Sequence, residues 1–205
     1  MRITVIGNGM VSYKFCEKLI AKAQSQFESI VFGEENRPVY DRVHLSEFFS
    51  NKTADDLFMA PKEWYAKNNI LLHLGDLVVK IDRSLKTIHS HHGITESYDY
   101  LVIPTGLSAF VPPIPGVEKE GVFIYRTIED VEMMPRYAKK AKKAAVIVGG
   151  LPDLEAAKAM LDLGITNTHI IEFAPRLMAG QIDHACADIL MAKLENLGLF
   201  IHILN

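Results

Sequence analysis

The sequence of 205 residues holds only two cysteines, one tryptophan and no apolar run near the roughly 20 residues that span a bilayer. Cys16 and Cys186 lie far apart and form no C-x-x-C pair, which excludes a dithiol built from neighbouring cysteines. We expect both to be buried as small apolar side chains. The formal net charge is −3, so nothing draws the whole chain to nucleic acid or to an anionic membrane. The chain opens directly into a strand-like run without a signal peptide, which makes the cytoplasm the expected compartment.

Residue patterns for several other chemistries are also missing. The histidines of HSHHG (89–93) have no cysteine or carboxylate beside them, so we expect a solvated hairpin and no metal site. The basic run RYAKKAKK (136–143) has no interleaved aromatic platform, which argues against a nucleic-acid surface. No set of Ser, His and Asp or of Cys and His indicates a nucleophile. We therefore predict no catalytic side chain and no metal ligand.

Two stretches of the chain repeat the order strand, glycines, helix, strand. The first comprises ITVIG (3–7), a helical pattern over 10–23 and SIVFG (29–33). The second comprises AAVIVGG (144–150), a helical pattern over 153–163 and THIIEFA (168–174), followed by a helix over 183–197 and a strand over 199–204. Such units pair their strands in parallel through a right-handed crossover. The sequence therefore predicts an α/β fold with two Rossmann-like βαβ units.

The region between the two units has a different character. Three short segments, 77–82, 86–90 and 98–106, predict a small antiparallel β-meander that leads back into a buried strand. VPPIPGV (111–117) follows with three prolines and a glycine, a composition typical of a connector. We accordingly expect one domain over 1–115 and a second over 116–205.

The first glycine loop, VIGNGMVS, meets three requirements of a dinucleotide site. Gly7 permits a tight turn, Gly9 lets the backbone approach a pyrophosphate, and Ser12 is small enough for the helix to pack against the strand. The helix that follows would direct its unpaired N–H groups at the phosphates. Glu34 and Glu35 stand at the end of the second strand, where an acidic side chain binds ribose hydroxyls. These features favour nucleotide binding over the alternative, a glycine-rich turn without a ligand.

Further segments identify the kind of nucleotide. YDYLVIPTG (98–106) resembles the ATG signature of flavoproteins that bind two dinucleotides. The segments EENRPVYDRVHLSEFF (34–49), NKTADDL (51–57), LHLGDLVVKID (72–82), AFVPPIPG (109–116) and YRTIEDVE (125–132) resemble the N-terminal region of the large subunit of assimilatory NAD(P)H nitrite reductase. That region belongs to the pyridine nucleotide-disulfide oxidoreductase flavoproteins, with ferredoxin and rubredoxin reductases as wider relatives. The resemblance covers essentially the whole chain and implies FAD as the first cofactor.

The resemblance assigns a first group of residues to the phosphate and ribose parts of FAD. Gly7, Gly9, Met10 and Val11 would line the pyrophosphate, and Glu34 would bind the adenosine ribose. In the family an inserted nicotinamide-binding domain of similar topology delivers hydride to the flavin, and the flavin passes electrons onward. The implied function is that of an FAD-dependent NAD(P)H oxidoreductase module.

A second group would complete the FAD site. Arg42 would face the phosphates or the flavin, since a guanidinium matches phosphate geometry. Val78 would meet the adenine through its backbone, and Thr105 and Gly106 would close over the cofactor. Arg126 would reach the cofactor from the second domain. The alternative for Arg42 and Arg126 is an ordinary surface ion pair.

The second glycine loop departs from the family pattern. In VGGLPDLEAA, counted back from Leu154, Val148 stands at the first glycine position and Asp153 at the third, where a carboxylate would repel a pyrophosphate. An alternative alignment keeps both glycines and removes one residue, and it also departs from the pattern. Asp153 is also a good candidate for the N-cap of its helix. Pro152 removes one backbone donor. These residues favour a structural role for the loop over NAD(H) binding.

Residues for NAD(H) are nevertheless present. Gly149 and Gly150 remain in the loop, and Glu172 stands where the family binds the ribose of NADH and disfavours a 2′-phosphate. The family's nicotinamide domain would continue past residue 205, so we expect a C-terminally truncated fold. The sirohaem and iron–sulfur part would lie in another domain or protein that accepts the electrons, and a homodimer is compatible with the family. The alternatives are a non-catalytic FAD- or nucleotide-binding module and a scaffold that binds nothing.

Overall fold

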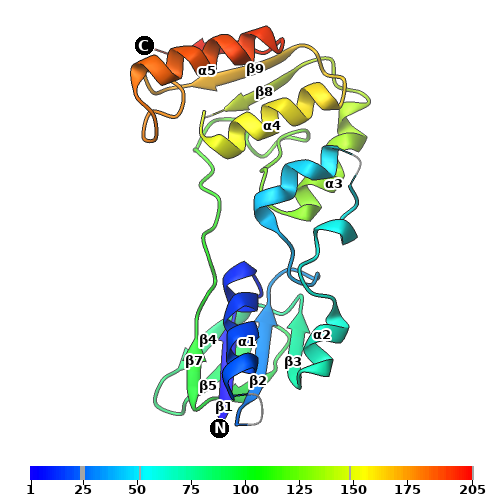
Figure 1. The fold of residues 1–205 in the computed structure, drawn as a ribbon, viewed down its shortest axis with the longest axis vertical. Coiled ribbons are helices and arrows are strands. Elements are labelled where there is room, and N and C mark those ends of the chain that lie inside the picture. The colour runs from blue at the N-terminus through cyan, green and yellow to red at the C-terminus, as the bar shows by residue number, and fades with distance from the viewer. Residues whose placement is uncertain (24–25, 51, 148, 205) are drawn as a thin grey trace. The chain divides into compact units, whose positions relative to one another are not determined.

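The computed structural model describes residues 1–23, 26–50, 52–147 and 149–204, and its elements are labelled in Figure 1. The chain divides into two compact units. The first comprises Met1–Arg42 and Asp55–Ser108, and the second comprises Val43–Ala54 and Ala109–Asn205. The functional domains expected over 1–115 and 116–205 stay a prediction.

A four-stranded parallel sheet forms the centre of the first unit. Its strands, in spatial order, are β3 (Ile70–Leu74), β2 (Glu28–Gly33), β1 (Arg2–Ile6) and β7 (Tyr100–Val102). In this register Thr4 lies beside Ile30 on one side and Leu101 on the other. The run of β-branched residues in β1 and β2 is buried from both faces, as the continuous apolar pattern predicts.

Two layers cover this sheet. On one face, α1 (Met10–Ala23) and α2 (Lys62–Lys67) pack over Val5 and Val31 through Cys16 and Tyr65. On the other face lies an antiparallel meander, whose Ile88 packs against Ile30. The meander consists of β4 (Val78–Asp82), β5 (Thr87–Ser90) and β6 (Thr95–Ser97). Two 3-10 helices, η1 (Arg42–Phe49) and η2 (Asp55–Leu57), lie between β2 and α2 in the sequence.

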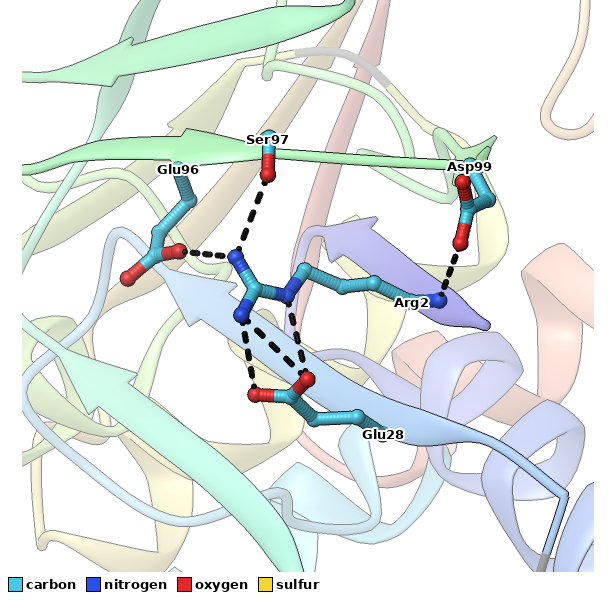
Figure 2. Close-up of polar contacts among 5 residues, drawn as sticks. All are labelled: Arg2, Glu28, Glu96, Ser97 and Asp99. Carbon is cyan, nitrogen blue, oxygen red and sulfur yellow. Dashed lines mark hydrogen bonds and ion pairs between the residues drawn. The ribbon is translucent and has the colours of Figure 1, made fainter.

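Arg2 links three strands at the end of the sheet opposite the glycine loop. Figure 2 shows its guanidinium paired with both carboxylate oxygens of Glu28 on β2, at 3.1 and 3.2 Å. The same group donates to Glu96 at 3.0 Å and to Ser97 at 3.2 Å, both on β6. The Arg2 backbone N–H donates to the Asp99 carboxylate at 2.7 Å. The cluster therefore ties the meander to the parallel sheet.

The second unit repeats the βαβ arrangement. Its parallel sheet has the order β10 (Phe200–Ile203), β9 (Thr168–Glu172), β8 (Ala144–Ile147), and its helices are α3 (Ile128–Ala138), α4 (Leu151–Asp162) and α5 (His184–Asn196). Leu154 of α4 and Leu194 of α5 share one core cluster with Ile170 of β9. Both crossover helices therefore pack on the same face of this sheet, as right-handed connections in one direction require.

The expected fold class is confirmed: two βαβ units with parallel sheets and a small antiparallel meander. Two local expectations are wrong, and one strand was not predicted. The returning strand is short, and it is a half-exposed edge strand, with Tyr100 53% exposed. β3 was not predicted, and Cys186 is exposed while Cys16 is buried. None of the helices over the described ranges is long and apolar enough to span a membrane.

Candidate nucleotide-binding sites

The first glycine loop connects β1 to α1 through a turn that only glycine tolerates. Gly7 has φ of +114°, and its N–H donates to the carbonyl of Phe32 at 2.8 Å. A Cβ at Gly7 would lie 2.6 Å from the carbonyl oxygen of Pro104 and 3.1 Å from the Cα of Thr105. The loop is therefore packed directly against the segment that leads to Thr105 and Gly106, two of the predicted cofactor residues.

Space opens beyond that turn. A Cβ added at Gly9 would have no atom of the described chain within 4 Å, and the same holds for Gly106. α1 begins at Met10, and its first turn has no acidic residue. Because the first N–H groups of a helix have no partner within it, this turn presents donors and the positive end of the helix dipole to the open space. Val11, 70% exposed, lies at this helix start.

Asn8, between the two glycines, holds the loop to α2. The buried Tyr65 hydroxyl donates to Asn8 Oδ1 at 2.8 Å, and burial raises the pKa of Tyr65, which keeps it a donor. A Cβ at Gly33 would lie 2.9 Å from the Cβ of Asn8, so the end of β2 also packs closely on the loop. Asn8 and Tyr65 were not predicted as site residues, because only the folded chain brings them together.

Glu34 and Arg42 lie in the segment after β2. Glu34 is exposed there, as a ribose-binding side chain requires. Arg42 forms an ion pair with Glu35 at 2.6 Å, and its guanidinium lies 5.0 Å from the ring centre of Tyr40. The Tyr40 hydroxyl donates to the second oxygen of Glu35 at 2.7 Å. The structure thus shows Arg42 in the ion pair considered as its alternative, and its contact with a cofactor stays a prediction.

Val78 and Arg126 complete the predicted FAD set. Val78 begins β4 and packs against the core cluster of Ile30 and Phe32, which fixes the backbone proposed to meet adenine. Arg126 belongs to the second unit, where its N–H donates to Asp130, and Thr127 and Asp130 form the capping box of α3. The approach of Arg126 to a flavin in the first unit stays a prediction.

The second glycine loop has a different hydrogen-bond arrangement. Glu172, buried at the end of β9, accepts from the N–H of Gly149 at 2.8 Å and from that of Ala174 at 2.7 Å. Asp153 accepts from the N–H of Gly150 at 3.0 Å. Burial, with a further contribution from the charge of Glu172, raises the pKa of Asp153. Val148, placed at the first glycine position by the sequence, lies outside the described residues.

One expectation at this loop is corrected. Asp153 is not the N-cap of α4, because the helix begins two residues earlier and its N-cap is Gly150. Pro152 is accommodated in the first turn, where the missing N–H breaks no helical hydrogen bond. Asp153 instead stands at the third helical position and bonds back to the N-cap backbone.

No group of three or more His, Cys, Asp or Glu within the described ranges is arranged to hold a metal ion. Within each unit the structure brings a glycine loop together with a side chain from another element, Asn8 with Tyr65 in the first unit and Gly149 with Glu172 in the second. Residues 1–204 match the family model of pyridine nucleotide-disulphide oxidoreductases. The chain belongs to this family.

Relatives within the family cover nearly all of the chain. The NADH nitrite reductase large subunit of Escherichia coli is 44% identical over 203 residues, which are 98% of this chain and 24% of that subunit. The assimilatory nitrate reductase electron transfer subunit of Bacillus subtilis is 36% identical over 97% of this chain and 26% of its own length. The chain thus spans about a quarter of these curated relatives.

Solved structures agree with this assignment. An NAD-dependent persulfide reductase from A. fulgidus is 27% identical, with a TM-score of 0.91 over 99% of this chain and 39% of its own. The NADH:rubredoxin oxidoreductase of Clostridium acetobutylicum is 25% identical, with a TM-score of 0.87 over 100% of this chain and 53% of its own. The family relationship was identifiable from the sequence motifs, whereas the loop hydrogen bonds were not.

Proposed function

We propose that the chain is the FAD-binding part of an NAD(P)H-dependent flavoprotein oxidoreductase, with electrons passed to an acceptor in another domain or protein. The observation that carries the proposal is the first loop. Gly9 faces open space beside the start of α1, in a turn without acidic side chains. An anionic pyrophosphate fits this combination of space, backbone donors and helix dipole. Relatives named as NADH nitrite reductase and NADH:rubredoxin oxidoreductase support the reaction class.

Each predicted residue then has a role in binding or orientation. Gly7, Gly9, Met10 and Val11 would present backbone to the pyrophosphate, and Glu34 would accept hydrogen bonds from the ribose. Arg42 would neutralise phosphate charge, and Val78 would hold the adenine edge through its backbone. Thr105 and Gly106 would border the cofactor. Arg126 would approach it from the second unit. FAD, when bound, supplies the hydride-accepting chemistry.

A matched pair of glycine substitutions tests the proposal. Gly9 and Gly180 both lack a positive φ, and an added Cβ meets no atom of the described residues within 4 Å at either position. Gly9→Ala should therefore leave the apo fold intact but weaken FAD binding at least tenfold, because the methyl group enters the proposed phosphate cradle. Gly180→Ala, in the second unit, should change neither the apo fold nor the affinity for FAD. FAD affinity is measured by flavin fluorescence quenching, and equal affinities of the two variants would refute the site.

A non-catalytic flavin-binding module is the second candidate function. The observation that favours it is the carboxylate of Asp153 on the second loop, because NADH must bind before it can reduce the flavin. Anaerobic addition of NADH to the FAD-loaded chain separates the two candidates. Bleaching of the flavin absorbance bands supports the oxidoreductase, and unchanged bands support the module without a hydride donor.

A further inference from the structure

Most backbone N–H groups of the second glycine loop already donate to acceptors of the chain itself. Of residues 149–153, Gly149 donates to Glu172 and Gly150 donates to Asp153. Pro152 has no N–H, and the N–H of Asp153 itself donates to the carbonyl of Gly150 at 3.1 Å. At most the N–H of Leu151 is left for an anion. A pyrophosphate at this helix start would need to displace at least one carboxylate.

The first loop provides an internal comparison, because it has the same strand–glycine–helix order. The positions equivalent to Pro152 and Asp153 are Val11 and Ser12, because each pair stands two and three residues after the second glycine of its loop, Gly150 or Gly9. α1 has no acidic residue in its first turn, whereas α4 has Asp153 there. The two loops of one chain therefore differ in charge at the same structural position.

Two carboxylates face the second loop from different elements. Glu172 comes from the end of β9 and Asp153 from the first turn of α4. A Cβ on Gly149 would lie 2.9 Å from Glu172 Oε2, and one on Gly150 would lie 3.1 Å from Asp153 Oδ2, so both groups lie directly on the loop backbone. Burial raises the pKa of Asp153, and repulsion from Glu172 adds to this rise. An additional phosphate charge would increase this repulsion.

We propose that Asp153 is a specificity-determining residue that excludes dinucleotides from the second glycine loop by placing its own carboxylate at the phosphate position. The carboxylate caps the Gly150 N–H and supplies the negative charge that a helix start favours, so α4 is stabilised without a ligand. The inference concerns the second unit alone and does not require FAD binding by the first. Of the two candidate functions it favours the non-catalytic flavin-binding module, because a wild-type loop that excludes NADH leaves the flavin without its hydride donor.

The test is calorimetric titration of NADH into the full chain, with wild type compared with Asp153→Gly and Asp153→Asn. Both variants should bind NADH at least tenfold more tightly than wild type, because each removes the charge from the loop. Asp153→Asn keeps the size of the side chain, so it reports on charge even if glycine loosens the helix start. Asp162→Asn removes the same charge from the other end of α4 and should leave NADH affinity unchanged.

Three results would overturn the proposal. The first is a wild-type NADH affinity that is already tight and within threefold of that of the Asp153 variants. The second is that folded Asp153→Asn and Asp153→Gly bind NADH no more tightly than wild type. The third is that Asp162→Asn gains as much NADH affinity as the Asp153 variants. Circular dichroism of each sample establishes folding. Flavin absorbance recorded in the same samples reports on the first loop separately, so a failure of the proposed FAD site is distinguishable from a failure at the second loop.

Discussion

The hydroxyl of Tyr65 donates a 2.8 Å hydrogen bond to the side chain of Asn8, the residue between the two glycines of the first loop. Tyr65 is 1% exposed and belongs to the core cluster under α2. The first glycine loop is therefore anchored to the apolar core by a neutral hydrogen bond. A loop held in this way loses less conformational entropy when a ligand binds.

Tyr65→Phe removes this hydrogen bond and keeps the ring. We expect the free energy of unfolding to fall by about 1–2 kcal/mol, because the Asn8 amide oxygen loses its buried partner. FAD affinity should fall severalfold as the loop gains freedom. Urea denaturation and FAD titration measure the two effects. The control is Tyr13→Phe, which keeps the ring packed against the core, loses only a 3.4 Å contact between its hydroxyl and Glu17, and should change both quantities little.

Gly7→Ala should damage the fold itself, in contrast to Gly9→Ala. The alanine would have to adopt φ of +114° with its Cβ 2.6 Å from the Pro104 carbonyl oxygen. Strain and clash together should cost about 2 kcal/mol or more in unfolding free energy, with loss of FAD binding as a consequence. Thermal denaturation of the apo protein checks this. Unchanged stability of Gly7→Ala would contradict the close packing of the loop on Pro104.

The Arg2 cluster of Figure 2 should contribute more than an isolated surface ion pair. Arg2→Met removes the pairs with Glu28 and Glu96 together, and we expect a loss of about 1–2 kcal/mol, reduced in 1 M NaCl by screening. Lys14→Met, which removes a single exposed pair with Glu17, should cost less than Arg2→Met, because exposed ion pairs contribute little to stability. Denaturant unfolding at low and high salt compares them, and equal losses would contradict cooperation within the cluster.

Asp76 should make the first unit sensitive to acid. Burial acts to raise the pKa of Asp76, but hydrogen bonds from Ser90 and the His92 N–H, with the imidazoles of His92 and His73, outweigh it and lower the pKa below its usual 3.8. A carboxyl group with a lowered folded-state pKa stabilises the fold above its unfolded pKa, and this contribution is lost as the pH falls below about 4.

Asp76→Asn should therefore lower stability at pH 7 by about 1–2 kcal/mol and flatten the decline of stability between pH 4 and pH 2. The charged hydrogen-bond acceptor is absent at every pH in this variant, which is the reason for both effects. Urea unfolding across this pH range is the measurement. Asp188→Asn, on the exposed side of α5, is the control and should keep the wild-type profile.

Local patterns predicted β1, α1 and β2 because each is a short stretch whose apolar spacing matches one period. β3 escaped prediction because ILLHL follows α2 with no glycine or proline to separate it, and its burial comes from pairing with β2. The candidate sites also depend on contacts that local patterns do not give. The spacing of the glycines predicted the loops, but the ion pair of Arg42 with Glu35 depends on how the chain turns after β2. The start of α4 was misplaced because Asp153 and Gly150 are both good N-caps, and Pro152 is tolerated within the first turn.

The reverse exchange of charge between the two loops gives the last prediction. Ser12 is buried in the first turn of α1, at the position equivalent to Asp153. Ser12→Asp should weaken FAD binding at least tenfold, because a carboxylate there would compete with the pyrophosphate for the same N–H donors. Ser12→Asn has nearly the same volume without the charge and should retain more of the affinity. FAD titration of both variants, with circular dichroism to establish folding, measures the difference. If the two variants bind FAD equally, packing at this position matters and its charge does not, and the charge argument would then fail for the second loop as well.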